Sequence, residues 1–358
     1  MHDKTILIMA GGTGGHVYPA LAVADCLKKQ GFQLYWLGTE KGLEKQIVPE
    51  HGYQLLTIRV SGMRGKGFIR LCLTPFMLLI ALWQAMLIMW EIKPTAVLGM
   101  GGFASGPGGI AAWLMGIPLL IHEQNAIAGM TNKLLAPFAT KIMASFPSAF
   151  EMQDKLLITG NPVRESITNI AVPEQRLKDK KHLNILVLGG SLGAAKLNEL
   201  IPAGLAQLTD CKFSVIHQCG ETHLDFTEEQ YRKVNLQADV RPFIKDMEAQ
   251  YAWADIVICR AGALTIAELA IAGVASILVP FPYAVDDHQT ANARYLEEGG
   301  AAIIIQQAHL TVERIKECLT CFFESYQSCI DMAIKARQLA RPDATQVVAN
   351  ACVEATYA

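Results

Sequence analysis

The sequence predicts an α/β protein made of two doubly wound halves, each built on a parallel sheet. Three observations lead to this fold class. Apolar strands alternate with helical segments, which is typical of a sheet covered by helices on both faces. A strand followed by a glycine-rich turn opens the pattern twice, at 5–16 and at 184–194. At 358 residues the chain is also longer than one ordinary core requires.

The same pattern gives the expected domain boundaries. It pauses at 160–164, so we expect an N-terminal domain at 1–161 and a C-terminal domain at 162–341. A final helix within 342–358 is expected to pack back on the first domain. Ligands of doubly wound sheets bind beyond the carboxyl ends of the strands, so a cleft between the two halves is expected as well.

In both halves the expected strands are short and apolar. In the first half they are 5–10, 34–37, 55–60, 96–100 and 119–122. A turn at 11–16 follows the first strand, and a helix is expected from about Val17 to Gln30, where Gly31 ends it. In the second half the expected strands are 184–188, 213–217, a short one around Val240, 256–259, 276–279 and 302–305.

Composition and charge limit the function classes. The chain is 51% hydrophobic and 18% charged, and its formal net charge of −2 implies no general affinity for nucleic acid. Residues 1–160 carry 13 Lys and Arg against 9 Asp and Glu, whereas residues 161–358 carry 18 against 24. The basic first half is therefore expected to meet something anionic. Nine cysteines without framework spacing, and no signal peptide, indicate a reducing cytoplasm.

The stretch 256–292 carries the strongest functional signal. Its first strand passes through small residues into a helix that is expected to begin near Leu264. The first N–H groups of such a helix, together with the positive end of its dipole, suit a diphosphate. Glu268 could accept hydrogen bonds from a ribose diol, and Gln289 arrives on the next loop. We interpret this stretch as a sugar-nucleotide site.

Two paired glycine turns, 11–15 and 189–194, indicate backbone that approaches a ligand closely. Neither is a dinucleotide fingerprint, because Val17 takes the last position of the first turn and Ser191 the middle position of the second. The alternative is that these glycines only permit tight turns. A third glycine-rich loop, 100–109, leaves room for a second phosphate-bearing ligand, or else allows a helix to pack closely on the sheet.

Candidate catalytic groups lie at strand ends. His16 sits at a helix N-terminus, where the dipole favours the neutral ring that can accept a proton; a capping or structural role is the alternative. The polar cluster 122–125 follows another strand and is interpreted as functional. The chain contains no Asp-x-Asp pair, so we expect no metal site and no cofactor. Helix dipole, backbone N–H groups and Arg164 would then neutralise a leaving diphosphate.

The stretch 71–90 is apolar except for Thr74, Pro75 and Gln84, and it is long enough to span a bilayer. Pro75, and the position of the stretch between strands, argue against a span. A buried crossover helix is one alternative. We favour a helix whose apolar face lies on an anionic leaflet, which basic residues ahead of it would attract. These residues are Arg59, Arg64, Lys66 and Arg70.

Together, these motifs resemble the MurG family of bacterial N-acetylglucosaminyltransferases over almost the whole chain. Three positions depart from the family pattern, because Phe103, Leu192 and Ala267 stand where Tyr, Gln and Ser are usual. The resemblance is carried by Ala-Gly-Gly-Thr-Gly-Gly-His at 10–16, Ser-Gly-Met-Arg-Gly-Lys at 61–66, Gly-Met-Gly-Gly-Phe-Ala-Ser-Gly-Pro at 99–107, His-Glu-Gln-Asn at 122–125, Gly-Asn-Pro-Val-Arg at 160–164, Gly-Gly-Ser at 189–191, Arg-x-Gly-Ala-Leu-Thr at 260–265 with Glu268, and Asp-His-Gln at 287–289 with Asn292.

The resemblance implies the two-domain GT-B glycosyltransferase fold. It also implies an inverting transfer of N-acetylglucosamine from UDP-N-acetylglucosamine to the 4-hydroxyl of the muramoyl sugar of lipid I, which forms lipid II. Such an enzyme would lie at the cytoplasmic face of the bacterial inner membrane as a peripheral protein. It would contact an anionic membrane surface through 64–90 and have proteins of cell-wall synthesis as further partners.

The resemblance also assigns residues. His16 would be the base, with Glu123 as the second catalytic candidate. The acceptor diphosphate would be cradled by Gly11, Gly12, Gly101, Gly102, Ser105 and Gly106. The donor would be bound by Thr13, Gly14, Gly15, Asn125, Arg164, Ser191, Ile244, Ala263, Leu264, Thr265, Ile266, Ala267, Glu268 and Gln289.

Three other functions stay open on the sequence. Another GT-B enzyme, such as a diacylglycerol glucosyltransferase, would share the nucleotide site and the membrane contact. A nicotinamide-dependent oxidoreductase would bind NADH, although both fingerprints are broken. A non-catalytic sugar-nucleotide-binding module would keep Glu268 and Gln289 but tolerate the loss of His16.

Overall fold

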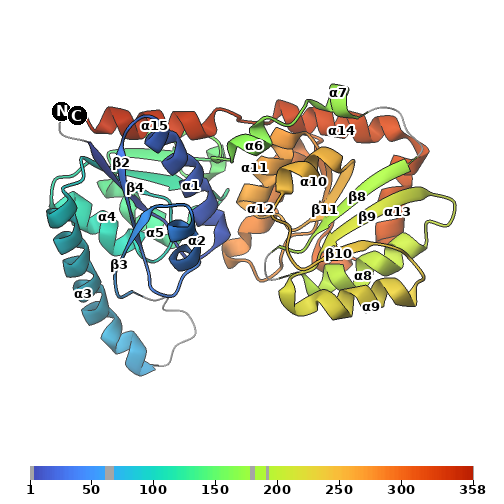
Figure 1. Cartoon of the computed structure of the whole chain (residues 1–358), viewed down its shortest axis with the longest axis horizontal. Helices are drawn as coiled ribbons and strands as arrows, with labels where there is room; N and C mark the ends of the chain where they lie inside the picture. Colours follow the sequence, from blue (N-terminus) through green and yellow to red (C-terminus); the bar gives the residue numbers. More distant parts are fainter. Residues whose placement is uncertain (1–3, 61–67, 178–181, 191–192, 358) are drawn as a thin grey trace. The chain divides into compact units, whose positions relative to one another are not determined.

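The computed structural model describes residues 4–60, 68–177, 182–190 and 193–357. The chain divides into two compact units, each with one parallel sheet and helices on both of its faces (Figure 1). Unit 1 comprises Met1–Arg164 and Pro342–Ala358, and unit 2 comprises Glu165–Arg341. The division between the units therefore lies three residues beyond the boundary drawn at 161 and 162.

Unit 1 contains a seven-stranded parallel sheet with the order β3-β2-β1-β4-β5-β6-β7. Its central strands are buried throughout, which explains why they are apolar without alternation. The sequence did not reveal the last two strands, because they are only four and three residues long and the final one, at the sheet edge, is partly exposed. The strands are β1 (Thr5–Met9), β2 (Gln33–Gly38), β3 (Gln54–Thr57), β4 (Ala96–Gly99), β5 (Leu119–Glu123), β6 (Lys141–Ala144) and β7 (Leu156–Ile158).

Helices cover both faces of this sheet. Strand β1 shows the two layers, since Ile6 and Ile8 pack into one apolar cluster and Leu7 and Met9 into the other. The first cluster joins the sheet to α1 and α15, and the second joins it to α3 and α4. The helices are α1 (Gly14–Lys29), α2 (Glu44–Glu50), α3 (Phe68–Ile92), α4 (Ser105–Leu114), α5 (Met130–Leu135) and α15 (Ala344–Ala355).

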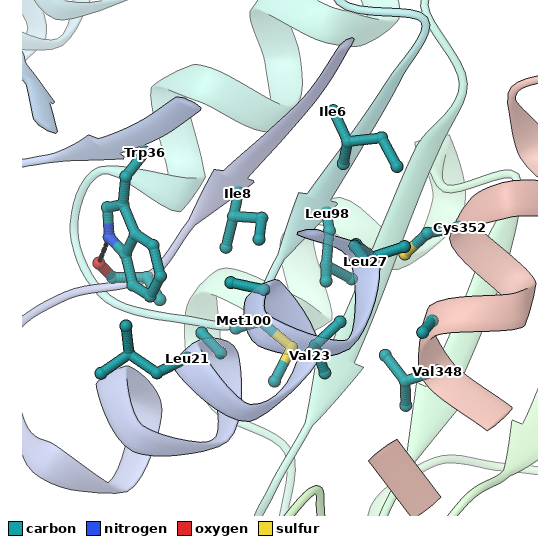
Figure 2. Packing of buried hydrophobic residues seen from close by; sticks show 14 of the residues in the cluster. Ile6, Ile8, Leu21, Val23, Leu27, Trp36, Leu98, Met100, Val348 and Cys352 are labelled. Carbon is teal, nitrogen blue, oxygen red and sulfur yellow. Dashed lines mark hydrogen bonds between the residues drawn. The ribbon is translucent and has the colours of Figure 1, made fainter. Parts of the chain in front are cut away.

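The C-terminal helix is part of the core of unit 1. Figure 2 shows Val348 and Cys352 of α15 in the same cluster as Leu27 of α1 and Leu98 of β4. At another part of this cluster, the indole Nε1 of Trp36 donates a 2.8 Å hydrogen bond to the carbonyl oxygen of Ala10, directly before the first glycine turn. The first glycine turn therefore begins where a buried hydrogen bond fixes the end of β1.

Helix α1 begins earlier than the sequence suggested. It starts at Gly14, three residues before Val17, so His16 lies in its first turn. Thr13 precedes the helix with an extended backbone, but its side chain makes no capping hydrogen bond. Two successive glycines weaken a local helix signal, and here the tertiary contacts of the loop outweigh that propensity.

Unit 2 contains a six-stranded parallel sheet with the order β10-β9-β8-β11-β12-β13. Each of its strands corresponds to one expected from the sequence. The strands are β8 (His182–Leu188), β9 (Lys212–Gln218), β10 (Asp239–Arg241), β11 (Ile256–Cys259), β12 (Ala275–Leu278) and β13 (Ala302–Ile304). The helices are α6 (Glu165–Thr168), α7 (Pro173–Arg176), α8 (Ala195–Ala206), α9 (Leu224–Lys233), α10 (Met247–Trp253), α11 (Ala263–Ala272), α12 (His288–Glu298), α13 (Val312–Glu324) and α14 (Tyr326–Gln338).

Candidate active site

The two glycine loops of unit 1 touch each other. They follow β1 and β4, which pair in parallel, so both loops leave the same edge of the sheet. A Cβ at Gly102 would lie 2.5 Å from the carbonyl oxygen of Gly11, and one at Gly101 would lie 2.8 Å from the His16 ring. Both glycines also have positive φ, at 93° and 99°. Only glycine therefore allows the second loop to lie against the first loop and against His16.

A buried carboxylate anchors the first loop. Glu44, at the start of α2, is 0% exposed. One of its oxygens accepts a 2.9 Å hydrogen bond from the Gly12 N–H, and the other accepts from the N–H and hydroxyl of Thr39 at 2.9 and 2.8 Å. A Cβ at Gly11 would lie 2.5 Å from Glu44 Oε1, so this glycine makes room for the carboxylate.

The anchor corrects the expected role of Gly12, because its N–H is directed at Glu44 and not at a diphosphate. Ser105 needs a similar correction. Its side chain is fully buried and its hydroxyl lies 2.8 Å from the Gly101 oxygen and 3.0 Å from the Met9 oxygen, so it holds the second loop in place. The groups suited to an anion are the first N–H groups of α1 and α4, which begin at neighbouring strand ends.

His16 is the end of a hydrogen-bonded chain that runs into the interior of unit 1. Its Nδ1 lies 3.0 Å from Gln124 Oε1. The Gln124 amide nitrogen lies 3.2 Å from His122 Nδ1. On its far side, His122 Nε2 lies 3.0 Å from the carbonyl oxygen of Gly160 and 3.1 Å from the Thr159 hydroxyl. The predicted cluster at 122–125 thus connects to His16 through Gln124, which sequence reasoning had assigned no role.

The second catalytic candidate, Glu123, is placed as a structural group. It is 2% exposed and both of its oxygens are occupied. Oε1 accepts from the N–H and side-chain amide of Asn125 at 3.0 and 3.2 Å, and Oε2 accepts from Gly129 N–H at 3.0 Å and the Asn132 amide at 2.8 Å. This geometry argues against Glu123 as a base. Its carboxylate instead shapes the loop after β5 that carries Asn125.

In unit 2, the predicted diphosphate site lies at the start of α11. The helix begins at Ala263, one residue before the expected start, and Gly262 precedes it with an extended backbone. Its first intrahelical hydrogen bond runs from the Ile266 N–H to the Gly262 oxygen. The N–H groups of 263–265 therefore lie at the N-terminus of the helix, without intrahelical acceptors. Glu268 lies about one turn further on, is largely buried, and accepts a 3.0 Å hydrogen bond from the Tyr251 hydroxyl. Tyr251 therefore orients the carboxylate expected to bind the ribose.

Gln289 joins the loops that follow β11 and β12. Its Oε1 accepts hydrogen bonds from Ala261 N–H at 3.2 Å and Phe281 N–H at 2.9 Å. The amide nitrogen is therefore the group that Gln289 can offer to a sugar. Ile244, another expected donor contact, is buried, and its N–H donates to Gln218 Oε1 at 3.0 Å.

All of the expected donor contacts stay predictions, including those of Arg164 and Ser191. Arg164 is the last residue of unit 1, and its guanidinium carbon lies 5.8 Å from the centroid of the Tyr18 ring. This contact is consistent with a cation resting on an aromatic face. Ser191 lies outside the described residues.

Among the described residues, no group of three or more His, Cys, Asp or Glu side chains could hold a metal ion. The sequence neighbours His217 and Cys219 illustrate this. Both ring nitrogens of His217 are occupied, by Asn198 Oδ1 at 3.1 Å and by the Tyr231 hydroxyl at 3.0 Å. Burial lowers the pKa of His217 to about 3, so the ring is neutral. His217 is therefore a core group of β9 that contacts α8 through Asn198 and α9 through Tyr231.

The helix α3 presents a broad apolar surface. Its inner face packs through Ala81, Ala85 and Met89, which are fully buried. Its outer face exposes Leu79 at 62% and Trp90 at 71%, along with further large apolar side chains. These are Phe76, Leu78, Ile80, Trp83 and Leu87. From Thr74 to Ile92 the helix is long and apolar enough to cross a bilayer, with mean hydropathy 1.7 and 17% of that window buried. A buried crossover helix is therefore not what forms here.

The chain has the two parallel α/β units of the GT-B class, and both units match family models of glycosyltransferases. Residues 6–144 match the glycosyltransferase family 28 N-terminal domain and residues 184–348 match the family 28 C-terminal domain. The chain belongs to glycosyltransferase family 28 and, within it, to the MurG transferases.

Two relatives that are similar to this chain over nearly its full length have the same name. A protein of Ectopseudomonas mendocina is 50% identical over 98% of both chains, and one of Psychromonas ingrahamii is 47% identical over 98% of both. Each is a UDP-N-acetylglucosamine–N-acetylmuramyl-(pentapeptide) pyrophosphoryl-undecaprenol N-acetylglucosamine transferase. The crystal structure of Acinetobacter baumannii MurG is 44% identical and superposes with a TM-score of 0.85, covering 98% of this chain and 99% of that one.

Proposed function

We propose that this protein transfers N-acetylglucosamine from UDP-N-acetylglucosamine to lipid I, forming lipid II. The observation that carries this proposal is the full-length similarity, near 50% identity, to transferases named for that reaction. The residues of the candidate site support it. A sugar-nucleotide site at α11 and a histidine between two glycine loops are the two parts that such a transfer needs.

The donor would bind through unit 2. Its diphosphate would accept hydrogen bonds from the N–H groups of 263–265, where the helix dipole favours negative charge. Glu268, held by Tyr251, would accept from the ribose hydroxyls, and the Gln289 amide would donate to the sugar. As UDP leaves, the helix N-terminus, together with Arg164, would stabilise the growing charge without a metal ion.

The acceptor would bind through unit 1. The N-termini of α1 and α4 would face its diphosphate, and the His16 ring would remove the proton from the attacking 4-hydroxyl. One base and one leaving group are enough for a single displacement, which inverts the anomeric centre. No side chain needs to form a covalent intermediate.

The apolar face of α3 would lie on the membrane that contains the lipid acceptor. Exposed Trp113 and Leu114 of α4, and Met130 and Leu134 of α5, add apolar surface on unit 1. The enzyme would thus be a peripheral protein at the cytoplasmic face of the inner membrane, where basic residues near α3 meet anionic headgroups. Of these, Arg64 and Lys66 lie outside the described residues.

Replacing Leu78 and Leu79 with Glu is expected to release the protein from anionic liposomes without unfolding it, because both side chains are exposed. Liposome flotation measures the release, and circular dichroism on the same sample measures folding. Phe226→Glu is the matched control, since Phe226 is similarly exposed but belongs to α9 of unit 2. Persistent flotation of the folded double variant would contradict membrane contact through α3.

The proposed reaction is tested with purified protein, UDP-N-acetylglucosamine and two acceptors. We expect sugar transfer to lipid I and none to diacylglycerol. The reverse preference would identify a different GT-B enzyme. Donor binding is tested separately, because UDP-N-acetylglucosamine at about a hundredfold excess over Kd should stabilise the protein by about 2.7 kcal/mol. Stabilisation by NADH instead would favour an oxidoreductase.

A further inference from the structure

His16, Gln124 and His122 form a chain of hydrogen bonds, called the relay below, that ends at the carbonyl oxygen of Gly160. The donor and the acceptor of each bond follow from this oxygen. Gln124 and His122, which connect His16 to the Gly160 carbonyl, are 1% and 0% exposed. The bonds that His122 makes with Gln124, Thr159 and Gly160 are therefore shielded from water. Each contact lies between 3.0 and 3.2 Å, within ordinary hydrogen-bond range. All of these residues belong to unit 1, so the relay is complete within one compact unit.

The carbonyl oxygen of Gly160 lies at the inner end of the relay and can only accept hydrogen bonds. His122 Nε2, 3.0 Å from it, must therefore carry a hydrogen. The Thr159 hydroxyl lies 2.8 Å from the same oxygen and can donate to it, so toward His122 it acts as an acceptor. Burial lowers the pKa of His122 to about 4, which keeps the ring neutral. A neutral ring with hydrogen on Nε2 has a lone pair on Nδ1.

The lone pair on His122 Nδ1 fixes the orientation of Gln124. It can accept only from the amide nitrogen of Gln124, at 3.2 Å, so the amide oxygen must point to the other side. That oxygen lies 3.0 Å from His16 Nδ1 and can only accept. His16 must therefore carry its hydrogen on Nδ1, which leaves the lone pair of the neutral ring on Nε2.

We propose that Gln124 and His122 are positioning residues that set the tautomer of His16, so that Nε2 is the atom that accepts the proton of the acceptor hydroxyl. This inference rests on the proposed transferase function for its chemistry. Gly101 supports it from the other side, because the missing side chain lets the loop lie against Cε1 and Nδ1 of the ring. The ring is thus held in one plane and in one protonation pattern.

With this tautomer of His16, every proton and bonding electron pair of the proposed sugar transfer is accounted for. The hydroxyl oxygen forms a bond to the anomeric carbon as its proton passes to His16 Nε2, and the carbon–oxygen bond to UDP breaks with both electrons leaving on UDP. His16 becomes an imidazolium whose Nδ1–H still donates to the Gln124 oxygen. A neutral amide thus takes the orienting position that a carboxylate occupies in hydrolytic triads.

The direct test reads the tautomer in the intact wild-type protein, without substrates. Nitrogen-15 NMR of histidine-labelled protein distinguishes a protonated from an unprotonated ring nitrogen, and the His16→Ala spectrum identifies the His16 signals. We expect Nδ1 protonated and Nε2 unprotonated at neutral pH. The opposite pattern would overturn the proposal even if the enzyme makes lipid II, so its failure is distinct from failure of the proposed function.

The second test is Gln124→Met, which keeps the length of the side chain but removes the amide. We expect the His16 signals to show a mixture of tautomers and kcat to fall about tenfold or more, with KM for UDP-N-acetylglucosamine unchanged. Gln153→Met, an exposed position of the same unit, is the control and should leave both constants unaltered. A folded Gln124→Met protein with wild-type tautomer and kcat would refute the relay.

Discussion

His16→Ala is expected to lower kcat at least about a hundredfold while binding of UDP-N-acetylglucosamine survives. The ring is placed by the first turn of α1, by Gly101 and by Gln124. The Glu44 carboxylate also lies against the first loop, but its oxygens accept hydrogen bonds from the Gly12 N–H and from Thr39. Glu123 cannot easily substitute, because four hydrogen bonds occupy its carboxylate. The measurement is kcat with lipid I, together with the donor Kd by calorimetry.

His51→Ala is the matched control for this experiment. His51 is also in unit 1 and is exposed, and its Nδ1 lies 2.9 Å from the backbone oxygen of Ile47. We expect its turnover to remain that of the wild type. If His16→Ala also kept wild-type turnover, the proton would have to leave by another route and His16 would be a structural residue.

Glu268→Ala is expected to raise KM for UDP-N-acetylglucosamine by about tenfold to a hundredfold, with a smaller effect on kcat. Hydrogen bonds to a charged group contribute about 1.5–3 kcal/mol, which corresponds to that range. The carboxylate is largely buried, and the Tyr251 hydroxyl holds it in the orientation in which we propose that it binds the ribose. Steady-state kinetics at saturating acceptor measure the change.

Two further variants make this result specific. Tyr251→Phe removes only the hydroxyl that orients Glu268, and it should raise the donor KM in the same direction by a smaller factor. Glu298→Ala removes an exposed carboxylate of α12 and should leave KM unchanged. A donor KM that is unaffected by Glu268→Ala would place the ribose elsewhere.

Most of the sheet architecture could be predicted, because each strand is a short apolar run between helical segments. The strand 256–259 coincides with β11, and the other strands of unit 2 lie within a few residues of their expected positions. Strands β6 and β7 were not predicted, because runs of four and three residues are too short to give a clear apolar pattern. The start of α1 was predicted three residues too late. Glycines at 14 and 15 have low helix propensity, and tertiary contacts stabilise the helix there.

The site was only partly predictable, because its decisive contacts join residues far apart in the sequence. The glycine turns were visible, but not the carboxylate beneath them, since Glu44 resembles an ordinary charged residue at a helix start. Glu123 and Ser105 were assigned to chemistry through the family resemblance, whereas in the structure their side-chain oxygens make hydrogen bonds that hold the loops. Gln124 lay inside a predicted polar cluster, and only the distance to His16 shows what it orients.

The measurement that tests the central claim most directly is a crystal structure of this protein with UDP-N-acetylglucosamine. We expect the diphosphate within hydrogen-bond distance of the N–H groups of 263–265, the ribose hydroxyls on Glu268, and no metal ion between donor and protein. A donor bound away from the N-terminus of α11, or one bridged to the protein through a magnesium ion, would contradict the account.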